Sequence, residues 1–375
     1  MKKFAALVLA GAMTLGLSAC GGGNTSTPAA STPAASSTPA ASTPAASTPA
    51  ASTGSDYASL DPVVLRGADS SGVGAAAQQL GELVAEKVDA ITGGQLTVEY
   101  YPNSEMGGDM DIQQQMLDGT LDYVVLQTAP TVSFVPAVAV FDLPMVFAQY
   151  DGDTIDQVLN GDDSEFLKAI APKYEEKNMK ILGYLQNATY RLTTSNVKLD
   201  TLDAFKGLQI RTMENSNHMA FWTAIGAAPT PLAWAEVFIS LQNGTIDAQE
   251  NAADTCASTN FQEVQKYLAC TNHILYANQL SMNKEKYDSL DPAYQEAINQ
   301  AVAEAIEEMK SQMVESDETN KQTLVDGGMT LIEYDDAFFQ EILALDTVQA
   351  LYDKIDADVN GLGTTLQEEL AAAQG

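Results

Sequence analysis

Hydrophobic and polar positions alternate along the chain with two different periods, and the change between periods predicts where strands and helices lie. Residues 63–68 and 95–101 are short apolar runs typical of strands. Between them, residues 73–91 carry apolar side chains at the helical spacing, and Gly93 follows in the position expected for a C-cap. The predicted apolar face of that helix consists of Leu80, Leu83, Val84, Val88 and Ile91.

The same order of elements continues through the next part of the chain. A helix is predicted at residues 109–117 and a short apolar strand at 123–126. A second set begins near Met179, with a helix at 234–242. The further strands are predicted at 181–185, 191–194, 208–213 and 246–248. Strands and helices that alternate at this spacing predict an α/β fold with right-handed crossovers and mostly parallel sheets.

A long helix is predicted near the C-terminal third of the chain. It begins with Asp291 as N-cap and Pro292 at its first position, and its pattern continues towards residue 323. At 1.5 Å per residue it would be about 45 Å long, more than one small domain needs. We therefore expect it to cross between two lobes; a single large α/β domain with a long surface helix is the alternative. The predicted buried stripe is Tyr294, Ile298, Ala301, Val302, Ile306, Met309 and Met313.

The first residues read as an export signal. Lys2 and Lys3 precede an apolar stretch, residues 4–17, which at about 14 residues is shorter than the roughly 20 that span a bilayer. The stretch ends in Leu-Ser-Ala-Cys, which resembles a bacterial lipobox with Cys20 as the lipidated residue. We therefore predict a lipoprotein signal peptide at 1–19, export, and anchoring to the cell membrane. An ordinary signal peptide without lipidation is the alternative.

Residues 20–56 are predicted to be a linker. The stretch 21–55 carries no charged side chain and repeats a Thr-Pro-Ala-Ala unit, so it cannot form a core and should be disordered. A flexible chain of this length spans roughly 30–35 Å on average and about 100 Å when extended. We expect a spacer between the lipid and the globular part, with its glycosylation left open.

The charge balance excludes several classes of protein. The 375 residues include 18 Lys+Arg and 50 Asp+Glu, a formal charge of −32. Nucleic-acid binding and anionic membrane surfaces both need clustered basic residues, so we expect neither a nucleic-acid partner nor a basic membrane patch. A hydrophobic fraction of 45% fits a soluble globular protein with about two domains rather than a multi-span transporter.

Enzyme motifs are absent from the sequence. It has no Gly-x-Ser-x-Gly, no Walker-type phosphate loop and no Gly-x-Gly-x-x-Gly. Its two histidines, His218 and His273, lie far apart, which makes a His-rich metal site improbable. His273 is expected to be a hydrogen-bonded structural residue, and His218 either a pocket residue or a half-buried scaffold group. We therefore predict no enzyme activity, no metal and no cofactor.

Two cysteines remain after Cys20. Cys256 and Cys270 could pair outside the cytoplasm and close a loop, which is worth about 3 kcal/mol on the chain-entropy model. Two buried free thiols are the alternative, because both residues sit among apolar neighbours. The sequence leaves the choice open.

The arginines are more informative than their number suggests. Only Arg66, Arg191 and Arg211 occur in this acidic chain, and a guanidinium matches a carboxylate with two parallel hydrogen bonds. Arg191 and Arg211 lie twenty residues apart on predicted neighbouring strands. They are candidates for anion binding, with surface salt bridges to nearby acidic residues as the alternative.

A series of sequence blocks around Arg211 resembles a known family. Leu-Gln-Ile-Arg-Thr-Met-Glu-Asn ends at Asn215, and Ile-Asp-Ala-Gln-Glu-Asn ends at Asn251. Further blocks in the same order are at residues 101–107, 117–122, 226–231, 234–238, 241–244 and 264–268. Together they resemble the extracytoplasmic solute-binding proteins of tripartite ATP-independent periplasmic (TRAP) transporters, the DctP type, over about residues 62–335.

The resemblance implies a fold and a domain division. It implies a two-lobe, type II-like periplasmic-binding-protein fold, with crossing strands and a long helix between the lobes. Lobe I would comprise 57–186 and 277–316, and lobe II 187–276 and 317–375. A ligand would bind where the lobes close on each other.

The resemblance also implies site residues. Arg211 would clamp a substrate carboxylate in bidentate fashion, and Asn251 would help to fix it. Arg191 matches a second basic position near that carboxylate, and Trp234 an aromatic position flanking the ligand. The residues at positions that contact the rest of the ligand are Ser70, Asp109 and Gln127. Pro130 stands where sialic-acid-binding members carry an extra arginine, which argues against sialic acid.

These observations predict a lipid-anchored binding protein that captures a small organic acid and delivers it to TRAP permease subunits in the membrane. A C4-dicarboxylate is the default ligand, with sugar acids and other monocarboxylates close behind. We expect a monomer. The alternatives are a ligand-binding sensor that serves a receptor and an exported hydrolase.

Overall fold

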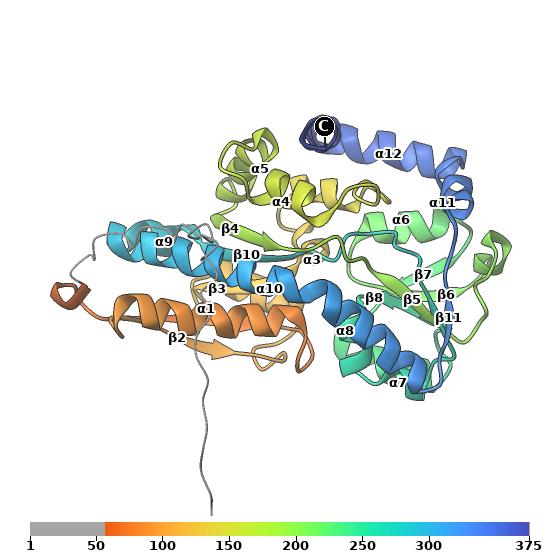
Figure 1. Ribbon diagram of the computed structural model, residues 1–375, viewed down its shortest axis with the longest axis horizontal. Helices are drawn as coiled ribbons and strands as arrows, with labels where there is room; N and C mark the ends of the chain where they lie inside the picture. Colours follow the sequence, from red (N-terminus) through yellow and green to blue (C-terminus); the bar gives the residue numbers. More distant parts are fainter. Residues whose placement is uncertain (1–56, 375) are drawn as a thin grey trace, which may run out of the picture. The chain divides into compact units, whose positions relative to one another are not determined.

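The computed structural model describes residues 57–374, which belong to one compact unit. The predicted signal peptide 1–19, Cys20 and the linker 20–56 lie outside the described residues. The described residues form a mixed α/β fold with two sheets, each at the centre of one lobe (Figure 1).

The first sheet has five strands. In spatial order they are β2 (Leu96–Tyr101), β1 (Val63–Asp69), β3 (Tyr123–Gln127), β10 (Asn278–Asn283) and β4 (Met179–Leu185). β1 pairs in parallel with β2 and β3, whereas β10 runs antiparallel between β3 and β4. The prediction of a mostly parallel sheet is therefore wrong at β10, which the apolar pattern did not reveal because this strand contains Asn278, Gln279, Ser281 and Asn283.

The second sheet has six strands. In spatial order they are β11 (Thr330–Ile332), β9 (Tyr267–Ala269), β5 (Leu192–Ser195), β8 (Ala248–Asn251), β6 (Gln209–Thr212) and β7 (Ala228–Pro231). β8 lies between β5, which follows Arg191, and β6, which carries Arg211. The prediction that these two strands are neighbours is therefore wrong. β5 is antiparallel to both β8 and β9, a second departure from the parallel expectation.

The helices cover both sheets. The α-helices are α1 (Ala76–Thr92), α2 (Asp109–Leu117), α3 (Thr128–Thr131), α4 (Gly152–Asn160), α5 (Glu165–Glu175), α6 (Ser216–Ala224), α7 (Trp234–Gln242), α8 (Ala253–Ser258), α9 (Lys284–Ser289), α10 (Pro292–Asp326), α11 (Asp336–Leu343), α12 (Asp346–Asp358) and α13 (Leu362–Ala373). The 3-10 helices are η1 (Tyr57–Ser59), η2 (Pro136–Asp142), η3 (Leu202–Phe205) and η4 (Phe261–Glu263).

Three segments connect the two sheets. The chain passes from β4 to β5 and returns from β9 to β10, and an antiparallel bridge between Tyr190 and Leu275 joins these two connections. The third segment is α10, which packs against α1 and β4 of the first lobe and against α8 and β9 of the second (Figure 1).

The long helix confirms the capping pattern read from the sequence. Asp291 accepts a hydrogen bond from the Ala293 amide at 2.9 Å, and Pro292 occupies the first position. All seven residues of the predicted stripe are buried. The helix runs three residues further than predicted, to Asp326, where Gly327 caps it.

The predicted division into lobes stays a prediction. Helix α13, which that division assigns to lobe II, packs against α4 and α5, next to β4 of the first sheet. Within residues 57–374, no helix combines the length and the apolar content needed to cross a membrane.

Gly81 marks a close approach between α1 and the first sheet. A Cβ at this position would lie 2.0 Å from the Tyr100 ring, which cannot move freely because its hydroxyl donates to Asp69 at 2.9 Å. We predict that Gly81→Ala lowers the free energy of unfolding by about 1–3 kcal/mol through overpacking. Helix propensity alone would raise it by about 1 kcal/mol. Urea denaturation distinguishes the two signs.

The matched control for this prediction is Gly81→Ala in a Tyr100→Ala background. With the ring removed, the alanine should stabilise α1 relative to that background. A destabilising effect of equal size in both backgrounds would contradict the contact with Tyr100.

Candidate functional site

A cavity between the two sheets gathers most of the residues that the sequence singled out. Its wall includes Ser70, Asp109, Gln127, Arg211, Trp234 and Asn251. Ser70, Asp109 and Gln127 come from the first lobe, just after β1, at the start of α2 and at the end of β3. The other three come from β6, the start of α7 and the end of β8 in the second lobe. Of the predicted ligand-contact residues, only Arg191 does not line this cavity.

Arg211 is buried, with unused hydrogen-bonding capacity. Only 2% of the residue is exposed, and its Nε and Nη2 donate to the Leu232 carbonyl oxygen at 2.9 and 2.6 Å. Its Nη1 has no hydrogen-bond partner among the described residues. A buried, unpaired donor on a cation costs free energy, so this edge of the guanidinium is suited to an anion that enters the cavity.

Two further effects act on the guanidinium of Arg211. Its Cζ lies 5.6 Å from the centre of the half-buried Trp234 ring, a distance suited to a cation–π contact. Burial lowers the pKa of Arg211 to about 10, although the nearby Glu250 and Asp109 carboxylates oppose the shift. The residue therefore stays charged at neutral pH.

Asp109 and Ser70 form the opposite, first-lobe part of the wall. The Ser70 hydroxyl donates to Asp109 Oδ1. Burial raises the pKa of Asp109 above its ordinary value, while Ser70 and the two arginines oppose that shift. This pair places hydrogen-bond acceptors in the cavity.

Asn251 and Gln127 meet across the two lobes. Gln127 Nε2 donates to Asn251 Oδ1 at 3.2 Å, and the backbone amide of Ala252 donates to the same oxygen at 3.0 Å. With its oxygen used in this way, Asn251 has its Nδ2 group left as a donor. The amide is therefore oriented as a donor.

Arg191 lies behind this pair rather than in the cavity. It is 1% exposed, and its Nε and Nη2 donate to the two carboxylate oxygens of Glu250 at 2.5 and 2.9 Å. Its Nη1 donates to Gln127 Oε1 and to Asn251 Oδ1, the latter at 3.3 Å. The alternative of a surface salt bridge is wrong, because this pair is buried. Direct contact of Arg191 with a ligand stays a prediction; the geometry supports an indirect role.

The Glu250 carboxylate also contacts both histidines. His273 Nε2 lies 3.1 Å from Glu250 Oε2, and His218 Nδ1 lies 3.7 Å from Oε1. Burial disfavours ionisation of Glu250, but Arg191 and the two histidines hold its pKa well below the usual range. His273 is a buried, hydrogen-bonded structural residue, as the sequence suggested. His218 is fully buried rather than half-buried and does not line the cavity.

Several cavity residues were missed from the sequence. They are Ser71, Ala77, Val125, Leu126, Met213, Thr255, Tyr276 and Asn278. Asn278 is the most informative, because it is fully buried on β10 and neither atom of its amide group has a hydrogen-bond partner among the described residues. The polar composition of β10 was the available signal, since a buried central strand rich in amides needs a reason to be polar.

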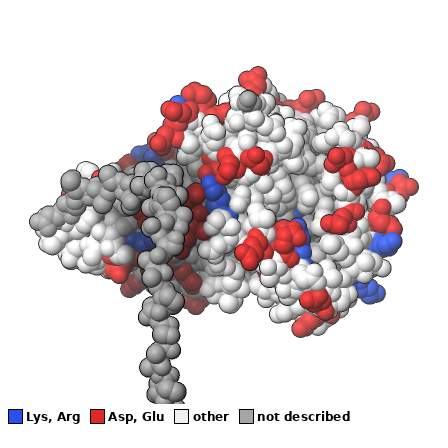
Figure 2. All heavy atoms as spheres, in the orientation of Figure 1, with Lys and Arg blue, Asp and Glu red and all other residues white. Residues whose placement is uncertain are grey.

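The wider surface contrasts with the cavity. Figure 2 shows acidic side chains spread over the visible face, with few basic ones among them.

Among residues 57–374, no cluster of His, Cys, Asp and Glu has the arrangement of a metal site. Cys256 and Cys270 are both buried free thiols.

His218 generates a prediction about stability and pH. Burial disfavours its charged form, but the hydrogen bond to Asp142 at 3.1 Å and the Glu250 carboxylate raise the pKa of His218 to about 9. The raised pKa favours the folded state at low pH, so this contribution is complete below about pH 6.5 and is lost as pH rises towards 9. We expect the free energy of unfolding to fall by on the order of 3 kcal/mol across that range.

Urea denaturation at pH 6 and pH 9 measures this effect. His218→Gln should remove most of the pH dependence above 6.5. Burial lowers the pKa of His273, the only other histidine, so that residue contributes below this range. Equal pH dependence in the wild type and the variant would contradict the assignment.

Comparison with known proteins identifies the family to which this chain belongs. The model of the bacterial extracellular solute-binding protein family 7, DctP, matches residues 67–358, well over half of the chain. A solute-binding protein of Verminephrobacter eiseniae is 30% identical over 291 residues, which cover 77% of this chain and 83% of that protein.

Two further relatives have named ligands. The 2,3-diketo-L-gulonate-binding periplasmic protein YiaO of Escherichia coli is 30% identical over 252 residues, or 67% of this chain and 73% of that protein. A TRAP periplasmic solute binding protein from Shewanella oneidensis, solved with bound succinate, superposes with a TM-score of 0.75 at 26% identity. That alignment covers 84% of this chain and 100% of the other. The chain therefore belongs to the DctP family of bacterial extracellular solute-binding proteins, which serve TRAP transporters outside the cytoplasm.

Proposed function

We propose that this protein captures a small hydroxylated monocarboxylate, such as a sugar acid, between its two lobes and delivers it to TRAP permease subunits. Lipidation at Cys20 would hold it at the membrane. The observation that carries the proposal is the buried Arg211, whose Nη1 has no partner in a cavity between the lobes. A ligand carboxylate would accept bonds from Nη1 and Nη2 together, the geometry that guanidinium favours.

Asn251 and Trp234 are suited to support the same carboxylate. The free donor of Asn251 would add a third hydrogen bond. The Trp234 ring, held against the Phe261 ring at a centroid distance of 5.8 Å, would exclude water from one side of the ion pair. Water exclusion strengthens a charge-assisted hydrogen bond because the local dielectric falls.

The rest of the cavity favours hydroxyl groups over a second carboxylate. Among the described residues that line it, Arg211 is the only basic one. Arg191 lies behind the wall, and Glu250 neutralises its charge there. A second carboxylate would meet the carboxyl group of Asp109. A hydroxyl group can donate to Asp109, and a further one can both donate to and accept from the unpartnered Asn278 amide. We therefore revise the default ligand from a C4-dicarboxylate to a hydroxy acid.

The first test is a ligand screen combined with Arg211→Ala. We expect one of D-glucuronate, D-galactonate or 2,3-diketo-L-gulonate to raise the melting temperature of the purified protein. Arg211→Ala should weaken binding of that acid in calorimetry by about 2–5 kcal/mol, because a desolvated anion would lose its charged partner. Arg211→Lys should restore little, since lysine lacks the planar fork.

Arg66→Ala is the matched control. Arg66 is partly exposed, contacts Asp122 and Gly119, and lies outside the cavity, so its removal should leave the affinity unchanged. Full affinity in the Arg211→Ala variant would overturn the clamp.

The second test concerns the choice between acids. Asp109→Asn replaces an acceptor-only group by one that can donate to a carboxylate. We predict that succinate gains about tenfold in affinity relative to D-glucuronate, a change of about 1.4 kcal/mol. Competitive calorimetry with both acids measures this ratio.

Asp111→Asn controls for the loss of one charge from the same helix. Asp111 bonds to the Gly108 amide at 3.1 Å and does not line the cavity, so the ratio should stay at its wild-type value. If the wild type binds succinate more tightly than all of the hydroxy acids, the preference for hydroxyl groups is wrong.

A further inference from the structure

Helix α1 begins without a cap of its own. The N-cap residue is the fully buried Ala75, whose side chain makes no capping hydrogen bond. The first amides of a helix have no partner within the helix and need an acceptor from elsewhere. The acceptor here is Asp254, whose Oδ2 lies 3.0 Å from the Ala76 amide nitrogen.

This hydrogen bond joins the two lobes. Helix α1 packs on the first sheet, whereas Asp254 lies on α8, directly after β8 of the second sheet. A second close approach lies beside it. A Cβ added to Gly72, in the loop before α1, would be 3.2 Å from Ser258 Oγ at the other end of α8.

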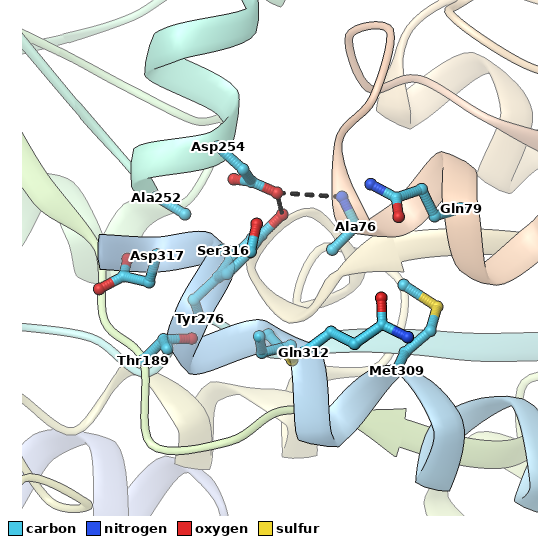
Figure 3. A pocket seen from close by; sticks show the side chains of 11 residues that line it. Ala76, Gln79, Thr189, Ala252, Asp254, Tyr276, Met309, Gln312, Ser316 and Asp317 are labelled. Atoms are coloured by element: carbon cyan, nitrogen blue, oxygen red, sulfur yellow. Dashed lines mark hydrogen bonds between the residues drawn. The ribbon is translucent and has the colours of Figure 1, made fainter. Parts of the chain in front are cut away.

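The same carboxylate binds a third segment. Asp254 Oδ2 also accepts from the Tyr276 hydroxyl at 2.9 Å, and Oδ1 accepts from the Thr255 amide at 2.5 Å. Figure 3 shows Asp254 between Ala76 and Tyr276, with both hydrogen bonds drawn. One carboxylate therefore gathers the start of α1, helix α8 and the connection that leads into β10.

Each of these contacts lies next to the proposed ligand site. Ala77, Thr255 and Tyr276 line the cavity that contains Arg211. Asp254 itself lines a second cavity of about 90 Å³, which is also bounded by Met309 and Met313 of α10. Space of that size can hold several water molecules, so packing beside the carboxylate is incomplete.

We propose that Asp254 is a positioning residue for ligand capture. It can cap α1 from the opposite lobe only while the two lobes lie close together. It therefore favours the closed arrangement, in which the walls of the cavity meet. The proposal rests on the proposed function, because it assumes that the ligand binds between the lobes. Asp254 itself does not line the ligand cavity.

Trp234 provides a readout of lobe separation that needs no ligand. The chain has two tryptophans: Trp222 is fully buried, and the half-buried Trp234 lines the cavity. Acrylamide quenching of the intrinsic fluorescence of the ligand-free protein therefore reports access to Trp234. Loss of a hydrogen bond to a charged acceptor should shift the open–closed equilibrium by about tenfold. We expect Asp254→Ala to raise the quenching constant.

Asp151→Ala is the matched control. Asp151 also caps a helix, α4, by accepting from the Thr154 amide at 2.8 Å, and it does so within one segment of the chain. Its loss should lower stability without changing the quenching. In a Trp234→Phe background, Asp254→Ala should leave the remaining Trp222 signal unchanged, which separates opening from unfolding.

Gly72→Val tests the same contact without touching Asp254. Its side chain would press against Ser258 and separate α1 from α8, so it should also raise the quenching constant. If the Asp254→Ala variant has the same quenching constant as the Asp151→Ala variant, the positioning role is overturned, whatever the effect on stability. If none of the acids binds but Asp254→Ala still opens the cavity, the proposed function fails while the role of Asp254 in holding the lobes together stands.

Discussion

The buried ion pair between Arg191 and Glu250 determines how the wall of the cavity between the lobes is built. Both side chains are removed from water, and each charge needs the other because an uncompensated buried charge costs about 3–5 kcal/mol. Glu250 is further held by His273, and Arg191 uses its remaining nitrogen on Gln127 and Asn251. One pair therefore fixes residues of both lobes. The pair is weak evidence for stability as such, but it gives the cavity wall a single arrangement.

The same pair explains why the two arginines differ. Arg191 and Arg211 are similarly buried, and the family resemblance predicted that both would lie near the ligand carboxylate. The difference arises because Glu250 occupies the fork of Arg191, whereas Arg211 has only the Leu232 carbonyl oxygen. Sequence separation alone could not reveal this, since the predicted strand order omitted the position of β8 between β5 and β6.

Predictions succeeded where local chemistry decides structure and failed where distant strands meet. The bounds of helix α7 and the first residue of α10 were predicted correctly, because capping residues and apolar stripes depend on neighbouring residues in the sequence. Strand β10 was missed because its polar side chains are satisfied, or left for a ligand, only by packing in the middle of a sheet. Resemblance identified six residues of one cavity. Asn278 became visible only through its burial without a partner, and Asp254 only through its hydrogen bonds.

The acidic surface makes the buried Arg211 important for the proposed function. A formal charge of −32 disfavours the approach of an anion, although screening at physiological salt limits that effect to about 8 Å. Attraction must therefore act at short range, within the cavity. Burial strengthens the attraction of Arg211 for a carboxylate, and it also lowers the pKa of Arg211. Since that pKa is about 10, nearly all of the molecules keep the charge at neutral pH, so the cavity gains a strong interaction without losing its cation.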